Sequence, residues 1–340
     1  MNPSPPTPSF SRRQFVRKVA EGAMWAGAAA AAWREMHAAE TNPFAYDVKR
    51  FSRTDPALLG WAETRRRTCP VKEARRLAFG PDDAVYIAAG TQVVRWSDAG
   101  DRPNLELGAP VRGVGVAADG TLFVALTDRL AVFDPAGRRL ADWRVPGART
   151  WFTGLAISDH AVFAADSGQR VVWRFDRAGK VLGRVGERDA TRGVPGIVLS
   201  SPYLDVRLHS DGLLRINNTG RHRVEVYTPD GDFEQAWGEP SAAIHGFCGC
   251  CNPIGLALLP DGRTVTCEKG LPRVKVYRAD GSLESVVAGP EAFAENTRQT
   301  APPAGGTRGG LDAGVDSRGR IHILDRVTGE VRTMQPGSRA

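Results

Sequence analysis

The chain has 340 residues, of which 42% are hydrophobic and 8% aromatic, a globular composition that is sufficient for a large core. Its 38 glycines and 23 prolines are more than a helical protein uses and are typical of a turn-rich, all-β chain. The formal net charge is +7, but residues 1–39 contain five of the basic residues against two acidic ones. No long basic run with interleaved aromatics follows. We therefore expect no nucleic acid partner, and we interpret the short run 65–67, three arginines, as a solvated face.

The N-terminal segment 1–39 is predicted to be a targeting signal that takes no part in the fold. Residues 11–18 read SRRQFVRK, which resembles the twin-arginine export motif. The alanine-rich stretch 19–33 that follows is too short and too weakly apolar for a stable membrane span. The resemblance implies export to the periplasm by the twin-arginine route, in folded form and often with a cofactor already inserted. The predicted mature domain is then 40–340, without a membrane span after signal cleavage.

Short apolar runs recur along this domain, and each is followed by a polar turn rich in Asp and Gly and by another apolar run. Six such pairs of predicted strands lie at 77–89, 114–126, 155–166, 205–217, 256–268 and 313–325. Five of the pairs are followed by a strand that ends in an aromatic residue, and these residues are Trp96, Phe133, Phe175, Tyr227 and Tyr277. The period-2 alternation and the Asp-Gly turns predict six four-stranded units. Units of this kind bury both faces only by stacking radially, so the predicted fold is an all-β, six-bladed β-propeller.

Three copies of the repeat share an Arg-Val step, an aromatic residue and an Asp-Gly or Asp-x-x-Gly turn, and they lie at 168–183, 220–235 and 270–285. This pattern resembles the NHL repeat, which occurs in six-bladed propellers, and the resemblance covers about residues 44–336. The last unit, from Leu311, is too short to contain its own outer strand. We expect residues 44–60 to supply that strand, so that the ring is closed by an N-terminal strand.

Strand order decides which end of the ring each loop occupies. The turns between the first and second and between the third and fourth strands of each blade share one end, here called the turn face. The loops between the second and third strands and the connections between blades share the other end, the loop face. Because loops on a rigid scaffold carry function, the loop face is the predicted functional face. The residues expected there, besides the cysteines, are Trp151, Phe152, Asp166, Gln169, Asn217, Asn218, His222, His245, Glu268, Lys269, Asp325 and Arg326. The other three histidines of the predicted mature domain, interpreted as structural or solvated, are His160, His209 and His322.

All five cysteines are also expected on the loop face, and three of them lie in the run 247–253, FCGCCNP. One interpretation is disulfides, because the predicted export places the domain in an oxidising compartment, with one thiol left over because five is odd. A second is a metal or iron–sulfur centre, since thiolates bind copper(I), zinc and iron–sulfur clusters. A third is free thiols. The predicted ligands of the second interpretation are Cys248, Cys250, Cys251 and Cys267, and the role of Cys69 is left open.

Three function classes fit these features, and the sequence does not decide whether the chain is an enzyme. The first is an exported propeller whose cysteine-rich loop face binds a metal, an iron–sulfur centre or a partner, in periplasmic redox metabolism. The second is a non-catalytic propeller with structural disulfides that docks a protein partner on the loop face. The third is a metal-dependent hydrolase or lyase resembling gluconolactonases, in which oxygen ligands hold a divalent ion at the channel. The candidate oxygen ligands are Asp166, Asn217, Asn218 and Asp325.

Overall fold

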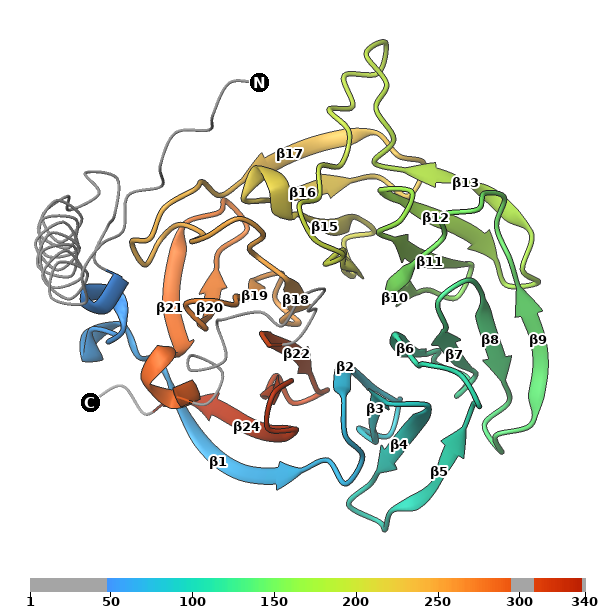
Figure 1. The fold of residues 1–340 in the computed structure, drawn as a ribbon, viewed down its shortest axis with the longest axis horizontal. Helices are drawn as coiled ribbons and strands as arrows, with labels where there is room; N and C mark the ends of the chain where they lie inside the picture. The colour runs from blue at the N-terminus through green and yellow to red at the C-terminus, as the bar shows by residue number, and fades with distance from the viewer. Residues whose placement is uncertain (1–47, 295–308, 338–340) are drawn as a thin grey trace, which may run out of the picture. The chain divides into compact units, whose positions relative to one another are not determined.

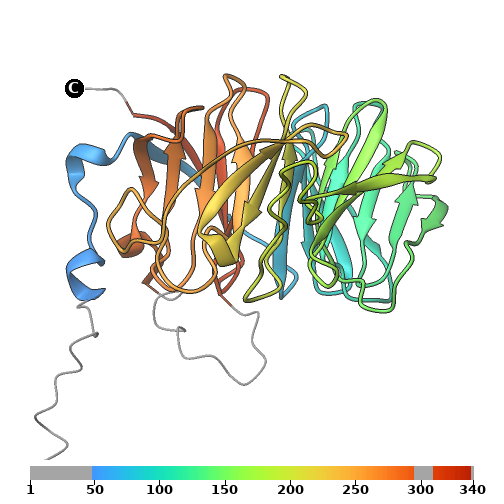
Figure 2. The same cartoon turned by 90° about the horizontal axis from the view of Figure 1, so that it is seen from above.

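The computed structural model describes residues 48–294 and 309–337, so the predicted signal 1–39 lies outside the described residues. Within this part, the chain forms six four-stranded antiparallel sheets arranged as blades around a central axis (Figures 1 and 2). The predicted all-β, six-bladed propeller is confirmed. In the described ranges, no helix is long and apolar enough to cross a membrane.

Each blade runs from an inner strand at the channel to an outer strand at the rim. The strands of blades 1 to 3 are β2 (Ala74–Phe79), β3 (Val85–Ala89), β4 (Gln92–Trp96), β5 (Arg102–Glu106), β6 (Gly113–Val116), β7 (Leu122–Ala125), β8 (Leu130–Phe133), β9 (Arg139–Trp143), β10 (Phe152–Ile157), β11 (Ala161–Asp166), β12 (Val171–Asp176) and β13 (Val181–Val185). The strands of blades 4 and 5 are β14 (Val206–Leu208), β15 (Leu214–Asn218), β16 (Arg223–Tyr227), β17 (Phe233–Trp237), β18 (Gly255–Leu258), β19 (Thr264–Cys267), β20 (Val274–Tyr277) and β21 (Leu283–Ala288).

The Asp-Gly turns of the repeat are formed as the sequence predicts. In blade 2, Gly120 has φ +80°, a left-handed conformation that favours glycine, and it ends the turn between β6 and β7. The Asp119 carboxylate accepts a hydrogen bond from the Thr121 backbone N–H at 2.9 Å, which fixes the turn.

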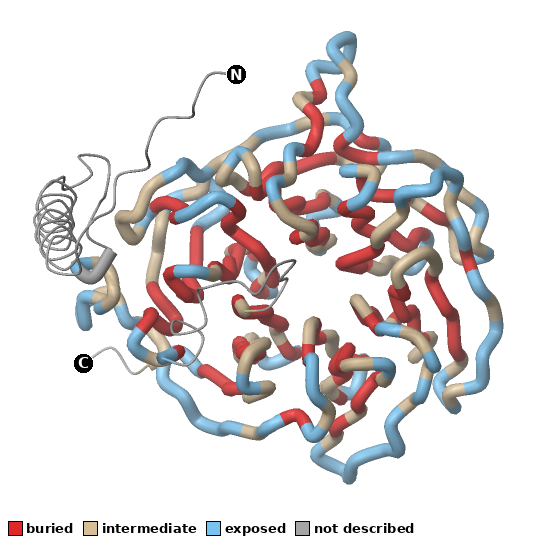
Figure 3. The backbone as a smooth tube through the Cα atoms, in the orientation of Figure 1, coloured by how far each residue is buried: buried red, intermediate tan, exposed pale blue. Residues whose placement is uncertain are grey.

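The hydrophobic core lies mainly between neighbouring blades. Figure 3 shows that buried residues are concentrated in the inner and middle strands of the ring. Between blades 2 and 3, the Trp143 ring lies 5.3 Å from the Phe123 ring and 5.6 Å from the Phe175 ring. The five aromatic residues that mark the repeat are all buried. Radial stacking therefore buries the apolar face that each sheet cannot cover alone.

Blade 6 is closed by an N-terminal strand, but the position predicted for that strand is wrong. Its order from the channel outward is β22 (Leu311–Val315), β23 (Ile321–Asp325), β24 (Glu330–Pro336) and β1 (Trp61–Thr68). The described part of the segment predicted to pair, residues 48–60, instead forms two 3-10 turns, η1 (Val48–Phe51) and η2 (Pro56–Leu58), and residues 44–47 lie outside the described ranges. Strand β1 is exposed along most of its length, so it lacks the alternation by which the other strands are recognised.

The three arginines of β1 connect the closing strand to its surroundings. Arg65 forms an ion pair with Asp98 of blade 1 at 2.9 Å, and Arg67 lies 4.1 Å from the centre of the Trp96 ring. Arg66 pairs with Glu63 on the same strand at 2.7 Å. The run is thus a solvated face, as interpreted from the sequence, that also joins the two ends of the ring.

Candidate functional site

All five cysteines lie on the loop face, as predicted. Cys69 precedes β2, and Cys248, Cys250 and Cys251 lie in the connection from β17 to β18. Cys267 is the last residue of β19. The structure has all five as thiols, so it shows none of the predicted disulfides.

The two carboxylates proposed as divalent-ion ligands are used to shape loops. Asp166 is fully buried and accepts hydrogen bonds from the Gly168 backbone N–H at 3.0 Å and from the Trp173 indole at 3.1 Å. Asp325 is also buried and accepts a bond from the Val327 backbone N–H at 2.8 Å. Each carboxylate therefore caps the loop that follows the second strand of its blade.

The two asparagines of the same set are also buried and bonded. The Asn217 amide donates to the Pro253 carbonyl oxygen at 2.8 Å, and the Asn218 oxygen accepts from the Val198 backbone N–H at 3.0 Å. Within residues 48–294 and 309–337, no group of three or more His, Cys, Asp or Glu side chains is arranged to hold a metal ion. The oxygen-ligand set of the hydrolase interpretation is therefore not supported by the geometry.

A buried charged trio holds the cysteine-containing connection against blade 5. Arg273 and Lys275 pair with the Glu268 carboxylate at 2.7 and 2.9 Å. Both cations also donate to the Gly246 carbonyl oxygen, at 3.3 and 2.7 Å, and the Cys248 backbone N–H donates to Glu268 at 3.2 Å. Burial lowers the pKa of Lys275 to about 8, although Glu268 opposes the shift. The trio fixes the start of the loop by charge-assisted hydrogen bonds.

Two of the thiols form a contact at the surface of the loop face. The Cys250 and Cys251 sulfur atoms lie 3.6 Å apart, with Cys250 exposed and Cys251 buried. Burial raises the pKa of the Cys251 thiol, against the lowering effect of the Ser201 and Lys269 side chains. Of the two thiols, only that of Cys250 is therefore exposed to solvent.

Cys267 and Cys69 belong to the hydrophobic core. Cys267 lies in the cluster between blades 5 and 6, where burial and the neighbouring Asp312 raise the pKa of its thiol well above the ordinary value. Cys69 lies in the cluster between blades 6 and 1. A four-cysteine centre that includes Cys267 thus stays a prediction that the described geometry does not support.

Two arginines and two aspartates form a tetrad in the central channel, in which Arg76 and both aspartates are buried and Arg207 is partly buried. Arg76 pairs with Asp205 at 3.0 Å and with Asp312 at 2.6 Å. Arg207 lies 3.2 Å from Asp205 and 4.0 Å from Asp312. Burial opposes the charge on Arg76, but the two carboxylates outweigh it and raise the pKa of that guanidinium. Arg76 lines a cavity on the loop side and Arg207 lines a different cavity on the turn side, so the tetrad divides the channel.

The cavity on the loop side, here called the cationic mouth, has a volume of about 30 Å³. Its lining residues are Arg75, Arg76, Arg112, Trp151, Thr153, Pro202, Tyr203 and Arg326. The Arg112 guanidinium lies 4.6 Å from the centre of the Trp151 ring, and that of Arg326 lies 5.2 Å from the centre of the Tyr203 ring. The Lys269 ammonium, also on the loop face, lies 4.7 Å from the Tyr203 ring.

Arg112 and Arg326 have no ion pair with a carboxylate among the residues that the structure describes. Burial lowers the pKa of Arg112, and the nearby Arg75 adds to the shift. Burial likewise lowers the pKa of Arg326, and Arg76 adds to it. Both groups stay charged at neutral pH because an arginine titrates far above it. An anion bound in the mouth would offset the electrostatic repulsion among these guanidinium groups.

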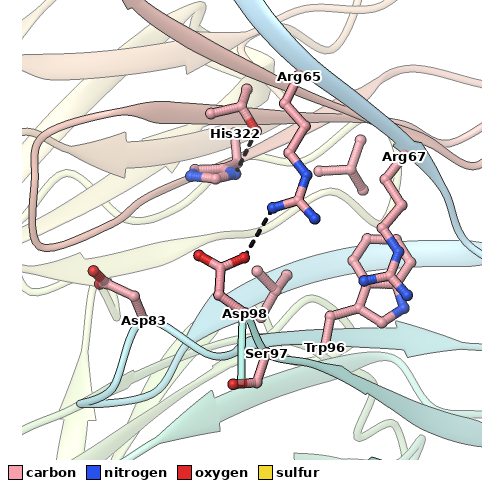
Figure 4. A pocket seen from close by; sticks show the side chains of 10 residues that line it. Arg65, Arg67, Asp83, Trp96, Ser97, Asp98 and His322 are labelled. Carbon is pink, nitrogen blue, oxygen red and sulfur yellow. Dashed lines mark hydrogen bonds and ion pairs between the residues drawn. The ribbon is translucent and has the colours of Figure 1, made fainter. Parts of the chain in front are cut away.

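A groove between blades 6 and 1 on the turn face has a volume of about 50 Å³ and is bridged by the Arg65–Asp98 ion pair (Figure 4). His322 lies at this groove and is buried. Its Nε2 donates to Asp316 at 2.9 Å, and its Nδ1 accepts from the Thr333 hydroxyl at 3.2 Å. Burial lowers the pKa of His322, which keeps the ring neutral. Both ring nitrogens are used to join strands of blade 6, so His322 is structural, as predicted.

Sequence reasoning placed Trp151, Lys269 and Arg326 on the functional face but missed most of the channel. The missed residues are Arg75, Arg76, Arg112, Tyr203, Asp205, Arg207 and Asp312. A usable signal was present, because Arg207 and Asp312 each interrupt an otherwise apolar inner strand, and Arg76 follows Arg75 within another inner strand. A charged residue within an inner strand of a propeller is expected to line the channel, because one edge of that strand faces the inner strands of the other blades.

No family model matches the sequence, and no curated protein matches it at the sequence level. The chain is similar in structure to a streptogramin B lyase, with a TM-score of 0.57 and 11% identity over 83% of this chain and 100% of that chain. It is similar to a catalytically inactive virginiamycin B lyase from Staphylococcus aureus with quinupristin, with a TM-score of 0.54 and 12% identity over 78% and 82% of the two chains. A chain of a mitotic checkpoint complex gives a TM-score of 0.55 and 13% identity over 87% and 100%. At such low identity these likenesses show a shared fold alone.

Proposed function

We propose that this chain is a non-catalytic, protein-binding β-propeller whose loop face recognises a partner segment that carries an acidic side chain. The observation that carries the proposal is the cationic mouth. There Arg112 and Arg326 lie against aromatic rings, and neither has a carboxylate partner among the described residues. A carboxylate from the partner would form ion pairs with both guanidinium groups.

The size of the mouth favours a docked side chain over an enclosed small molecule. Small-molecule sites are clefts of about 300–1,000 Å³ that enclose most of the ligand. The mouth has a volume of about 30 Å³, which is the volume of about one water molecule in the liquid. It therefore admits only the tip of one side chain, such as a carboxylate oxygen, and the remainder of the bound segment would lie across the surrounding loops, which are the common binding surface of a rigid scaffold.

Binding of an acidic peptide is the direct test. We expect a fluorescein-labelled peptide of alternating Glu and Gly to bind the full-length chain, and we expect the affinity to fall as salt is raised, because the attraction is electrostatic. Replacing Arg112 and Arg326 together by Ala should weaken binding by about tenfold or more, since charged hydrogen bonds contribute about 1.5–3 kcal/mol each. Fluorescence anisotropy measures both effects.

Two controls accompany this test. Arg138→Ala removes one positive charge on the turn face, where the side chain is 84% exposed, and it should leave the affinity unchanged. A peptide with Gln in place of Glu should bind at least about tenfold more weakly, for the same hydrogen-bond reason. Equal binding of the Glu and Gln peptides would show that the mouth does not recognise a carboxylate.

The second candidate function is binding of a thiophilic metal ion by the adjacent thiols, in an exported redox protein. It is favoured by the 3.6 Å separation of the Cys250 and Cys251 sulfur atoms. Two thiolates on one tetrahedral zinc ion lie about 3.8 Å apart, given zinc–sulfur bonds of about 2.3 Å. Cys248 lies in the same loop, but no third His, Cys, Asp or Glu of the described residues is arranged with these two thiols to hold an ion, and Cys267 lies in the core.

Elemental analysis of the purified full-length chain tests this candidate. If the thiols hold zinc or copper, Cys251→Ser should remove the metal, because the ion loses one of two adjacent sulfur ligands. Cys69→Ser is the matched control and should leave the metal content unchanged. Protein that is metal-free under anaerobic purification would contradict the candidate.

We also propose that the chain is exported by the twin-arginine route, on the strength of the SRRQFVRK motif. Replacing Arg12 and Arg13 by Lys is expected to leave the protein in the cytoplasm, because the receptor reads the paired guanidinium groups. Arg17→Lys, outside the pair, should export normally. Cell fractionation followed by immunoblotting measures the distribution, and periplasmic accumulation of the double variant would show that a different route is used.

A further inference from the structure

The turn-face end of the channel is surrounded by a ring of half-buried apolar side chains, one from each blade. They occupy the same position in every repeat, at or next to the end of the inner strand, and they are Phe79, Val116, Ile157, Leu208, Leu258 and Val315. A closed apolar ring of this kind, left partly open to solvent, is typical of a surface that contacts a ligand or partner.

The ring surrounds a chamber with a volume of about 240 Å³, here called the apolar chamber. That volume equals about eight water molecules and is slightly below the usual range of small-molecule sites. It is eight times the volume of the cationic mouth on the opposite side of the tetrad. The two ends of the channel therefore differ in both size and polarity.

Arg207 is the only charged residue among those that line the apolar chamber in the described structure. Its Nε donates to the Leu256 carbonyl oxygen at 2.6 Å. Its Nη2 is buried and lies 3.2 Å from Asp205, but among the described residues it has no partner with hydrogen-bond geometry. Nη1 has no hydrogen-bond partner among the described residues and is not one of the buried atoms, so its N–H groups are available to an acceptor in the chamber.

We propose that the apolar chamber is a second ligand site, separate from the loop face, that binds a small aromatic or aliphatic carboxylate of about nine non-hydrogen atoms. The apolar body lies within the six-residue ring, and the carboxylate accepts hydrogen bonds from Arg207. Charge complementarity supports an anion. The only charged side chain in the chamber lining, among the described residues, is the cation Arg207.

Fluorine NMR of 4-fluorobenzoate with the full-length chain tests the proposal. We expect a concentration-dependent shift or broadening of the fluorine signal. The uncharged 4-fluorobenzyl alcohol should bind at least about tenfold more weakly, because it cannot accept charged hydrogen bonds from Arg207. Ile157→Trp places a large side chain at the ring and should weaken 4-fluorobenzoate binding by about tenfold or more, since the added ring fills the chamber.

The control variants separate this site from other effects. Leu182→Trp makes a similar change on the outer strand of the same blade, where the side chain is 45% exposed, and it should leave binding intact. Replacing Arg112 and Arg326 by Ala should also leave it intact, so failure here is distinguishable from failure of peptide binding on the loop face. No fluorine shift at millimolar 4-fluorobenzoate, equal binding of the alcohol, or unchanged binding to Ile157→Trp would overturn the proposal.

Discussion

A chain that begins at Cys69 is expected to aggregate, whereas a chain that begins at Val48 should fold into a monomeric propeller. Removing β1 leaves β24 as an unpaired strand at the rim of blade 6, with its backbone N–H and C=O groups open to pairing with another molecule. The change removes seven paired residues from the sheet. The expected loss of stability is on the order of 5 kcal/mol, which approaches the total stability of many domains.

Size-exclusion chromatography and thermal unfolding measure this effect. The chain that begins at Val48 is the matched control, because it keeps every strand in the described residues. Adding a synthetic peptide of residues 61–68 to the shorter chain should restore part of the monomer. A monomeric, cooperatively unfolding chain that begins at Cys69 would show that β1 is not needed for closure.

Replacing Arg76 by Met is expected to lower the free energy of unfolding by about 3–5 kcal/mol, which is typical when one partner of a buried ion pair is removed. Arg76 is 5% exposed, and both of its partners, Asp205 and Asp312, are fully buried. Without Arg76, Arg207 alone must compensate two buried carboxylates, one of them at 4.0 Å. Urea denaturation followed by tryptophan fluorescence measures the change.

A double variant distinguishes this electrostatic cause from lost packing. Arg76→Met combined with Asp312→Asn removes one charge of each sign, so it should be more stable than Arg76→Met alone. Arg138→Ala, which breaks an exposed ion pair on the turn face, should change stability by about 1 kcal/mol or less. A double variant less stable than Arg76→Met would contradict the explanation.

Most of the fold is predictable because the repeat places the same residue types in the same environment six times. Each third strand of blades 1 to 5 carries a buried aromatic residue at or next to its end, and these residues are Trp96, Phe133, Phe175, Tyr227 and Tyr277. The alternation of the inner strands and the Asp-Gly turns follow from local chemistry alone. These features needed no knowledge of which blades are neighbours.

The closing strand was misplaced because it has no such local pattern. Strand β1, WAETRRRT, is exposed on both sides over most of its length and pairs through its backbone. The more apolar segment 48–60 was the better strand candidate by composition, yet it forms turns, and Leu59 bridges Val286 on blade 5. An outer edge strand gains little from burial, so hydrophobicity does not locate it.

The candidate site was predictable only as a face of the ring. Strand order places the cysteines, Trp151 and Arg326 at one end, and the structure confirms that placement. The tetrad beneath the cationic mouth combines side chains from blades that lie far apart in the sequence, such as Arg76 and Asp312, which are 236 positions apart. The separation of Cys267 from the other thiols depends on side-chain packing, which strand order does not determine.

Because β1 pairs with β24, the last strand of the chain, β1 stays unpaired during most of synthesis. Thr64 on β1 bonds to the Thr333 carbonyl oxygen on β24, 269 positions later. At about 5–20 residues per second, β1 emerges from the ribosome roughly 15–50 s before its partner exists. An apolar strand would risk pairing with other nascent chains during that interval, whereas Arg65, Arg66 and Arg67 repel such contacts. The charges that made β1 hard to recognise in the sequence therefore keep it unpaired until β24 has been synthesised.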